Sequence, residues 1–116
     1  MRKPTTREMS AKHEKFIADL IEGKRTRNSG AVWSDQMDVR NDVRDTRWAF
    51  AADGKATLGN SIGVSRDMWR KAVEQSHDLR PMLPLRWYNT DRLDVGLDLV
   101  VISADDFREM LEELRG

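Results

Sequence analysis

The sequence predicts an α/β fold, a mixed β-sheet flanked by helices, with its elements in the order α-β-β-α-β-β-α. Two observations predict it: three segments carry apolar residues at helical spacing, and several shorter segments between them are apolar enough to form strands. The 116 residues include no cysteine, so a hydrophobic core must stabilise the fold without disulfides. This length fits one domain, and we expect a single domain over residues 1–116.

Each predicted helix follows a residue suited to cap it. Thr5 and Glu8 have the spacing of a capping box for a first helix that ends near Gly23. The second helix should fade near Asp78, and the third should span Ala104–Leu114. The candidate N-caps are Thr5 or Ser10, then Ser65, then Ser103. The apolar stripes expected to face the sheet are Met9, Phe16, Ile17, Leu20 and Ile21; Met68, Trp69, Ala72 and Val73; and Phe107, Met110, Leu111 and Leu114.

The segments between the helices read as strands and turns. Gly23–Gly30 is rich in glycine and polar residues and predicts a loop. Pro81 and Pro84 favour an edge position or an irregular start for the strand that contains them. The segments expected to be extended are Ala31–Trp33, Met37–Arg40, Arg47–Ala52, Ser61–Val64, Pro81–Tyr88 and Leu93–Ile102.

Composition excludes several classes of protein. Without cysteine there is no thiolate zinc site and no cysteine nucleophile. The longest aliphatic run, Leu99–Ile102, is too short to span a membrane, and the first residues lack the apolar core of a signal peptide, so we expect a cytoplasmic protein. The net charge of zero hides a gradient, because residues 1–90 carry 17 basic and 12 acidic side chains while residues 91–116 carry 3 and 8. One positive face for nucleic acid is therefore compatible with the composition.

The pattern Asp38 … Asp53-Gly54-Lys55 is the most informative one for chemistry. Residues i and i+2 of an extended segment point the same way, so Asp53 and Lys55 should project together from the end of the preceding strand. Asp38 from a neighbouring strand and the Gly54 carbonyl would complete an all-oxygen site of the kind that Mg²⁺ prefers. Water bound to such an ion becomes a nucleophile, and Lys55 could orient it or neutralise charge on a phosphate.

Other segments fit the same arrangement: Glu14 in the first helix, Asn28–Ala31 after the basic loop, Met37-Asp38-Val39, Asp53–Thr57, Ser61–Ser65 and Arg80–Arg86. Together they resemble the PD-(D/E)xK nuclease superfamily and, more narrowly, the archaeal-type and phage-encoded Holliday junction resolvases. Two positions depart from that pattern, since Asp53 stands where the subgroup usually has Glu and Met37 where it has Gly or Pro. Asp42 and Asp45 remain candidates for the first acid.

The resemblance implies a restriction-endonuclease-like core and a homodimer that cleaves branched DNA, with Mg²⁺ as cofactor and Mn²⁺ as its substitute. It also implies a phage-encoded protein acting in a bacterial cytoplasm. Asp38, Asp53, Lys55 and Glu14 would be the catalytic residues, and Gly54 would join the three acids around the metal. The residues expected to bind DNA are Lys24, Arg25, Arg27, Asn28, Ser29, Arg40 and Thr57.

For some of these residues a purely structural role is the alternative to a functional one. Glu14 lies beside Ile17 and Ile21 at the edge of an apolar stripe, where it is either solvated or joins the metal site. His13 lies nearer the centre of that stripe and is expected to be a core or interface histidine. Two other functions stay open: a repair or restriction endonuclease, and a DNA-binding module of the same fold without activity.

Overall fold

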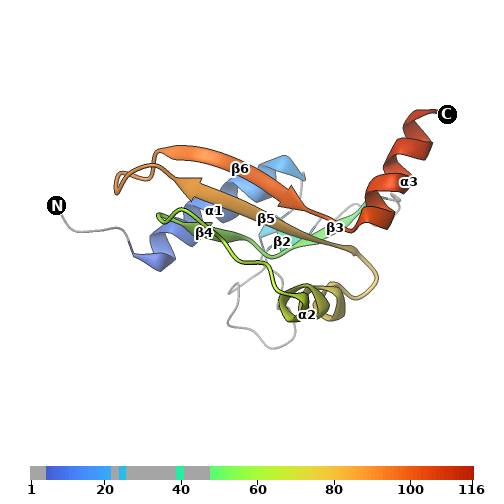
Figure 1. Cartoon of the computed structure of the whole chain (residues 1–116), viewed down its shortest axis with the longest axis horizontal. Helices are drawn as coiled ribbons and strands as arrows, with labels where there is room; N and C mark the ends of the chain where they lie inside the picture. Colours follow the sequence, from blue (N-terminus) through green and yellow to red (C-terminus); the bar gives the residue numbers. More distant parts are fainter. Residues whose placement is uncertain (1–4, 22–23, 26–38, 41–47) are drawn as a thin grey trace.

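The computed structural model describes residues 5–21, 24–25, 39–40 and 48–116. These residues form three helices and a six-stranded mixed sheet, in the order α1, β1, β2, β3, β4, α2, β5, β6, α3 (Figure 1). The α/β class is therefore confirmed. The predicted order has two strands between the first two helices and is wrong there, because the structure has four, β1 to β4. Among the described helices, none has the length and apolar character needed to cross a membrane.

The helices begin where the sequence predicts. α1 (Thr6–Leu20) starts with the expected capping box, in which Thr5 Oγ1 accepts from the Glu8 N–H at 3.0 Å and Glu8 Oε2 accepts from the Thr5 N–H at 3.2 Å. Ser65 caps α2 (Arg66–Ser76), and Ser103 caps α3 (Ala104–Leu114). Each serine accepts a hydrogen bond at 3.0 Å from the backbone N–H three residues on.

The first strands form an antiparallel meander. β1 (Lys24–Arg25) pairs with β2 (Val39–Arg40), and β2 pairs with β3 (Phe50–Ala52). The loop predicted over Gly23–Gly30 is thus wrong at Lys24–Arg25, because two charged residues gain strand structure only by pairing with a distant segment. The predicted strand over Arg47–Ala52 begins only at Phe50, and Ser61–Val64 forms no strand. The predicted segment Ala31–Trp33 lies outside the described residues.

β5 (Arg80–Tyr88) is the central strand of the sheet. It runs parallel to β3 and to β4 (Lys55–Thr57) on one side, and antiparallel to β6 (Val95–Val101) on the other. The prediction of an edge position for β5 is therefore wrong. Its pairing with β6 starts only at Leu83, so Pro81 lies outside that ladder.

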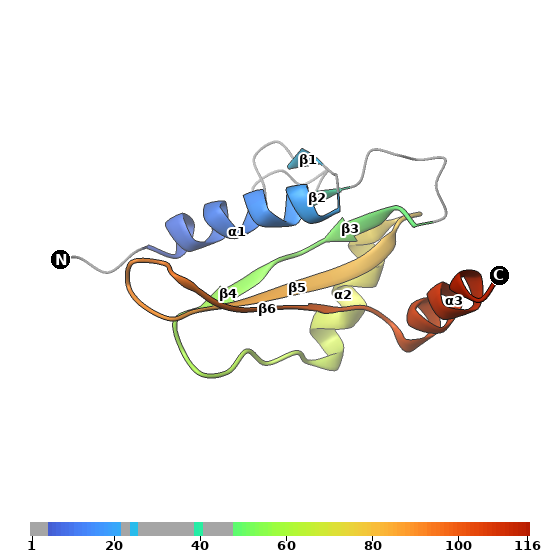
Figure 2. The ribbon, with the colours of Figure 1, turned by 90° about the horizontal axis from the view of Figure 1, so that it is seen from above.

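Helices cover opposite faces of the sheet (Figure 2). On one face, Ile17 of α1 packs with Phe50, Ala52 and Met82. On the other face, Ala72 of α2 packs with Ala51 and Leu83. Helices thus cover both faces of the sheet around β3 and β5, while Leu97 and Leu99 of β6 are each 48% exposed.

The predicted apolar face of α3 is wrong at Phe107 and Leu114, whereas Met110 and Leu111 are half-buried. Phe107 is 54% exposed and Leu114 is 83% exposed, while Met110 does pack against the core. The reason is position, because α3 follows the end of β6 and stands beyond the sheet instead of lying over it (Figures 1 and 2). Two residues of the other predicted stripes, Leu20 and Val73, are also about half exposed, at 50% and 47%.

Candidate active site at the break between β3 and β4

β3 and β4 are two parts of one extended segment that runs parallel to β5. Ala52 is paired with Met82 and Lys55 with Leu85, so the register does not change across the two residues between the strands. The Asp53 N–H still donates to the Met82 carbonyl at 3.0 Å. In a parallel ladder the next bond would run from the N–H of residue 84 to the Asp53 carbonyl. Residue 84 is proline and has no N–H, which explains why the strand is interrupted at Asp53 and Gly54.

The charged pair predicted from the i, i+2 spacing is present at this break. Lys55 Nζ lies 3.3 Å from Asp53 Oδ2, and the two side chains are 37% and 25% exposed. An ion pair with this exposure contributes at most about 1 kcal/mol to stability. Both charged groups are thus accessible from solvent and lie together, although their ion pair adds little to the stability of the fold.

The two charged side chains lie on the face of the sheet that α2 covers. Side chains alternate along a strand, and Ala51 packs on the α2 face while Ala52 packs on the α1 face. With the register unchanged, Asp53 and Lys55 share the face of Ala51, and Gly54 faces α1. The chain that follows β4 borders this face, since Trp87 Nε1 donates to the Asn60 carbonyl at 3.1 Å.

Asp38, the predicted first acid, lies outside the described residues, as do its alternatives Asp42 and Asp45. Its chain neighbour Val39 is described and is the Cα partner of Ala52. Ala52 in turn directly precedes Asp53. The residues next to the two predicted acids are therefore paired across β2 and β3.

Glu14 is half-buried on α1, as its place at the edge of the apolar stripe predicts. α1 packs on the Gly54 face of the sheet, whereas Asp53 points from the other face. Among the residues that the structure describes, no three His, Cys, Asp or Glu side chains converge as a metal site. Glu14 and Asp53 are therefore not brought together with a third described ligand.

The predicted DNA-binding residues are placed only in part. Lys24 is the Cα partner of Arg40, so β1 and β2 bring the backbones of Lys24, Arg25 and Arg40 together. Arg27, Asn28 and Ser29 lie outside the described residues. Thr57 ends β4, and its Oγ1 accepts a hydrogen bond from the Gly59 N–H at 2.9 Å. The hydroxyl hydrogen of Thr57 takes no part in that bond.

Two residues that affect this site were not assigned to it from sequence. Pro84 interrupts the ladder beside Asp53, and a proline inside an apolar strand was the available signal. His13 was expected in the core or at an interface and is 2% exposed in the core, but no pattern indicated that it contacts the site. A Cβ placed on Gly54 would lie only 3.0 Å from His13 Nδ1.

The environment of His13 is apolar and positively charged. Burial and the positive charge of Arg86 lower the pKa of His13 from 6.5 to about 4, and the negative charge of Asp98 opposes them. Nε2 is buried without a hydrogen-bond partner among the described residues. His13 is therefore neutral at pH 7.

A comparison with protein-family models finds no match, and comparisons with curated proteins and with solved structures find none either. Any functional assignment therefore depends on the residues at the break and their geometry.

Proposed function

We propose that this chain is a Mg²⁺-dependent, structure-specific endodeoxyribonuclease that resolves four-way (Holliday) DNA junctions. The observation that carries the proposal is the Asp53–Lys55 ion pair at the strand break, 3.3 Å long and partly exposed. The pairing of Val39 with Ala52 supports it, because Asp38 directly precedes Val39 in the chain. Two acids and a lysine at adjacent strand ends suit hydrolysis of a phosphodiester.

The residues have distinct roles in this proposal. Asp38, Asp53 and the Gly54 carbonyl would hold Mg²⁺, which lowers the pKa of a bound water and neutralises charge on the phosphate. Lys55 orients the attacking water or the phosphate oxygen. The water oxygen would attack phosphorus and give up a proton to solvent, as the bond to the leaving sugar oxygen breaks and that oxygen takes up a proton from solvent. We leave Glu14 out of the direct ligand set, because α1 lies on the other face of the sheet.

Substrate shape, not sequence, is the expected basis of recognition. Reading base edges needs an element that enters a groove, whereas contacts to phosphates position DNA without reading its sequence. Basic residues of β1 and β2 would contact phosphates. A homodimer would set two such sites against opposed strands of a junction.

The test is cleavage of a synthetic four-way junction with Mg²⁺. Asp53→Asn and Lys55→Met should each lower the cleavage rate by about 100-fold or more, because each removes one electrostatic contact to the reacting groups. Asp67→Asn is the matched control, since that carboxylate is 87% exposed on α2 and should leave the rate unchanged. Full cleavage by both site variants would contradict the proposed site.

The same assay separates the remaining alternatives. Equal cutting of a linear duplex and a junction would indicate another endonuclease of this fold. No cutting of either, with DNA binding intact and no heat of Mg²⁺ or Mn²⁺ binding by calorimetry, would indicate an inactive DNA-binding module. Sedimentation velocity of the free protein tests the homodimer.

A further inference from the structure

Gly54, the residue between Asp53 and Lys55, is in unusually close contact with α1. A Cβ built on Gly54 would lie 2.6 Å from Ile17 Cδ1, 3.0 Å from His13 Nδ1 and 3.2 Å from His13 Cε1. Atoms at such distances overlap, so no larger residue fits unless the Ile17 and His13 side chains, α1 or the strand move.

Space, and not backbone conformation, requires glycine here. Among the described glycines only Gly116 has a positive φ, so the backbone at Gly54 is one that other residues adopt. The neighbours have little room to yield, because Ile17 is 0% exposed and His13 is 2% exposed. Ile17 is also held by the core around Phe50 and Met82.

The ladder with β5 is interrupted beside Gly54. Pro84 has no N–H that could donate to the Asp53 carbonyl. At this point the three heavy atoms nearest to a Cβ on Gly54 all belong to Ile17 and His13 of α1.

We infer that α1 positions Asp53 and Lys55 through the contact of Ile17 and His13 with Gly54. Ile17 and His13 are positioning residues that act through Gly54 and do not themselves touch substrate. For catalysis this inference rests on the proposed function, but the positioning itself is a property of the free protein.

Gly54→Ala tests the contact, and Ile17→Val supplies the rescue. The added methyl group should displace the break and lower junction cleavage by about 10- to 100-fold, because misplacing a catalytic group by about 1 Å has that effect. Ile17→Val removes Cδ1, so the double variant should regain most of the lost rate. Gly63→Ala is the matched control, since a Cβ there would meet nothing within 4 Å.

A readout without metal or DNA comes from NMR at pH 7. The Asp53 carboxyl ¹³C and Lys55 ¹⁵Nζ shifts should move in Gly54→Ala and return toward the native values in the double variant. If Gly54→Ala only destabilised the fold in general, the shifts in the double variant would not return toward the native values. Ile17→Val itself opens a cavity, so it would add to such a destabilisation. If Gly54→Ala does not fold, the double variant alone tests the inference. Asp53 and Lys55 shifts that differ from the native values in the double variant would overturn it.

The outcomes distinguish this inference from the proposed function. Native shifts in Gly54→Ala, with junction cleavage at the native rate, would overturn the positioning role and leave the nuclease standing. The expected shifts and rescue in a protein that cleaves no DNA would overturn the nuclease and support the positioning of the pair.

Discussion

At the scale of single residues, Arg86 shows how this fold accommodates a charge in the middle of its central strand. Its side chain is 5% exposed and binds Asp98 through two hydrogen bonds, from Nε at 2.7 Å and Nη2 at 3.0 Å. The guanidinium also lies 4.4 Å from the centre of the Phe16 ring on α1. The ion pair and the aromatic contact together offset the free-energy cost of burying this charge.

Removing the partner of Arg86 should therefore be costly. Asp98→Asn leaves a buried guanidinium without its anion, and we expect the free energy of unfolding to fall by about 2–4 kcal/mol. Urea denaturation measures it. Asp91→Asn, in the exposed turn before β6, should change stability by less than about 0.5 kcal/mol. If Asp98→Asn lowered the free energy of unfolding as little as Asp91→Asn does, Arg86 would be shown to be solvated.

His13 makes stability depend on pH over a definite range. Its pKa in the folded protein, about 4, is below the ordinary value of 6.5 that it has when unfolded. The neutral histidine thus stabilises the fold fully above pH 6.5, and this contribution is lost as the pH falls from 6.5 to 4. The total is about 3 kcal/mol, since each pKa unit corresponds to about 1.4 kcal/mol.

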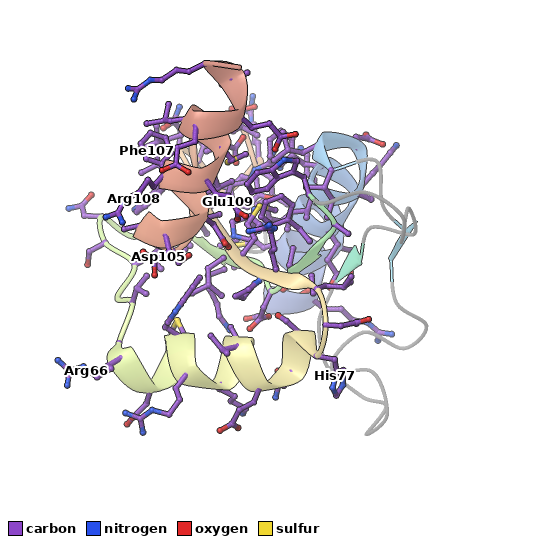
Figure 3. The ribbon with its side chains drawn as sticks, turned by 90° about the vertical axis from the view of Figure 1, so that its right-hand side faces the viewer. Arg66, His77, Asp105, Phe107, Arg108 and Glu109 are labelled. Carbon is purple, nitrogen blue, oxygen red and sulfur yellow. The ribbon has the colours of Figure 1, made fainter. Side chains whose placement is uncertain are left out.

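The pH effect is measured as a difference between variants, because carboxylates also titrate in part of this range. Unfolding free energies of the native protein and of His13→Leu should diverge by about 3 kcal/mol between pH 7 and pH 4. His77→Asn, at the exposed end of α2 (Figure 3), should keep the native profile. Parallel profiles for the native protein and His13→Leu would refute the assignment to His13.

At the scale of elements, α3 is attached to the rest of the molecule mainly by polar contacts. Arg80 Nη1 lies 2.5 Å from Asp106 Oδ1 and 2.6 Å from Glu109 Oε2, and its guanidinium stacks 4.0 Å from the Trp48 ring centre. Trp48 Nε1 donates to Glu113 Oε2 at 2.6 Å. Figure 3 shows Glu109 on the side of α3 toward the sheet and Phe107 on the side away from it. We call Arg80 and its acidic partners on α3 the Arg80 clamp.

Breaking the Arg80 clamp should loosen α3 alone. Arg80→Met keeps the aliphatic stem but removes the ion pairs, so amide exchange in α3 should speed up by about 10-fold, while α2 keeps its native rates. Hydrogen–deuterium exchange resolved by segment measures both helices. Arg108→Gln is the control, because its side chain is 72% exposed and its ion pair with Asp105 is long, at 4.0 Å. Equal exchange in both variants would mean that apolar contacts hold α3.

At the scale of the whole molecule, the charge gradient along the chain acquires a spatial meaning. The acidic C-terminal part ends in α3, beyond the end of the sheet, whereas β1 and β2 lie on the side of the sheet away from β6 (Figure 2). The basic residues of β1 and β2 are thus separated from much of the negative charge. For the nuclease that we propose, this separation would favour approach of DNA from the β1–β2 edge.

Salt dependence of junction binding tests that arrangement. Each phosphate contact that is lost lowers the slope of log K against log salt by about 0.9, so Arg25→Gln should reduce the slope by about one. Arg92→Gln, in the turn between β5 and β6, should leave it unchanged. Fluorescence anisotropy with labelled junction in metal-free buffer gives the slopes, and equal slopes for both variants would contradict the β1–β2 edge as the contact.

The helices and the longer strands follow from the sequence because their signals are local. Thr5, Ser65 and Ser103 cap the helices as their side-chain chemistry predicts, and the apolar runs of β5 and β6 are visible in any window of several residues. The i, i+2 spacing was likewise enough to predict that Asp53 and Lys55 lie together. The roles of the predicted site residues and their DNA contacts remain predictions.

What the sequence alone could not determine depends on contacts between distant segments. β1 exists because Lys24 and Arg25 pair with β2. Phe107 and Leu114 of α3 are exposed because α3 continues past the end of β6 and does not lie over the sheet. The break at Asp53 arises because Pro84, thirty-one residues later, has no N–H to donate to the Asp53 carbonyl. Local sequence determines which backbone and side-chain forms are available to each segment. Only packing in three dimensions decides which residues face one another, and at Gly54 it is the approach of α1 that requires glycine.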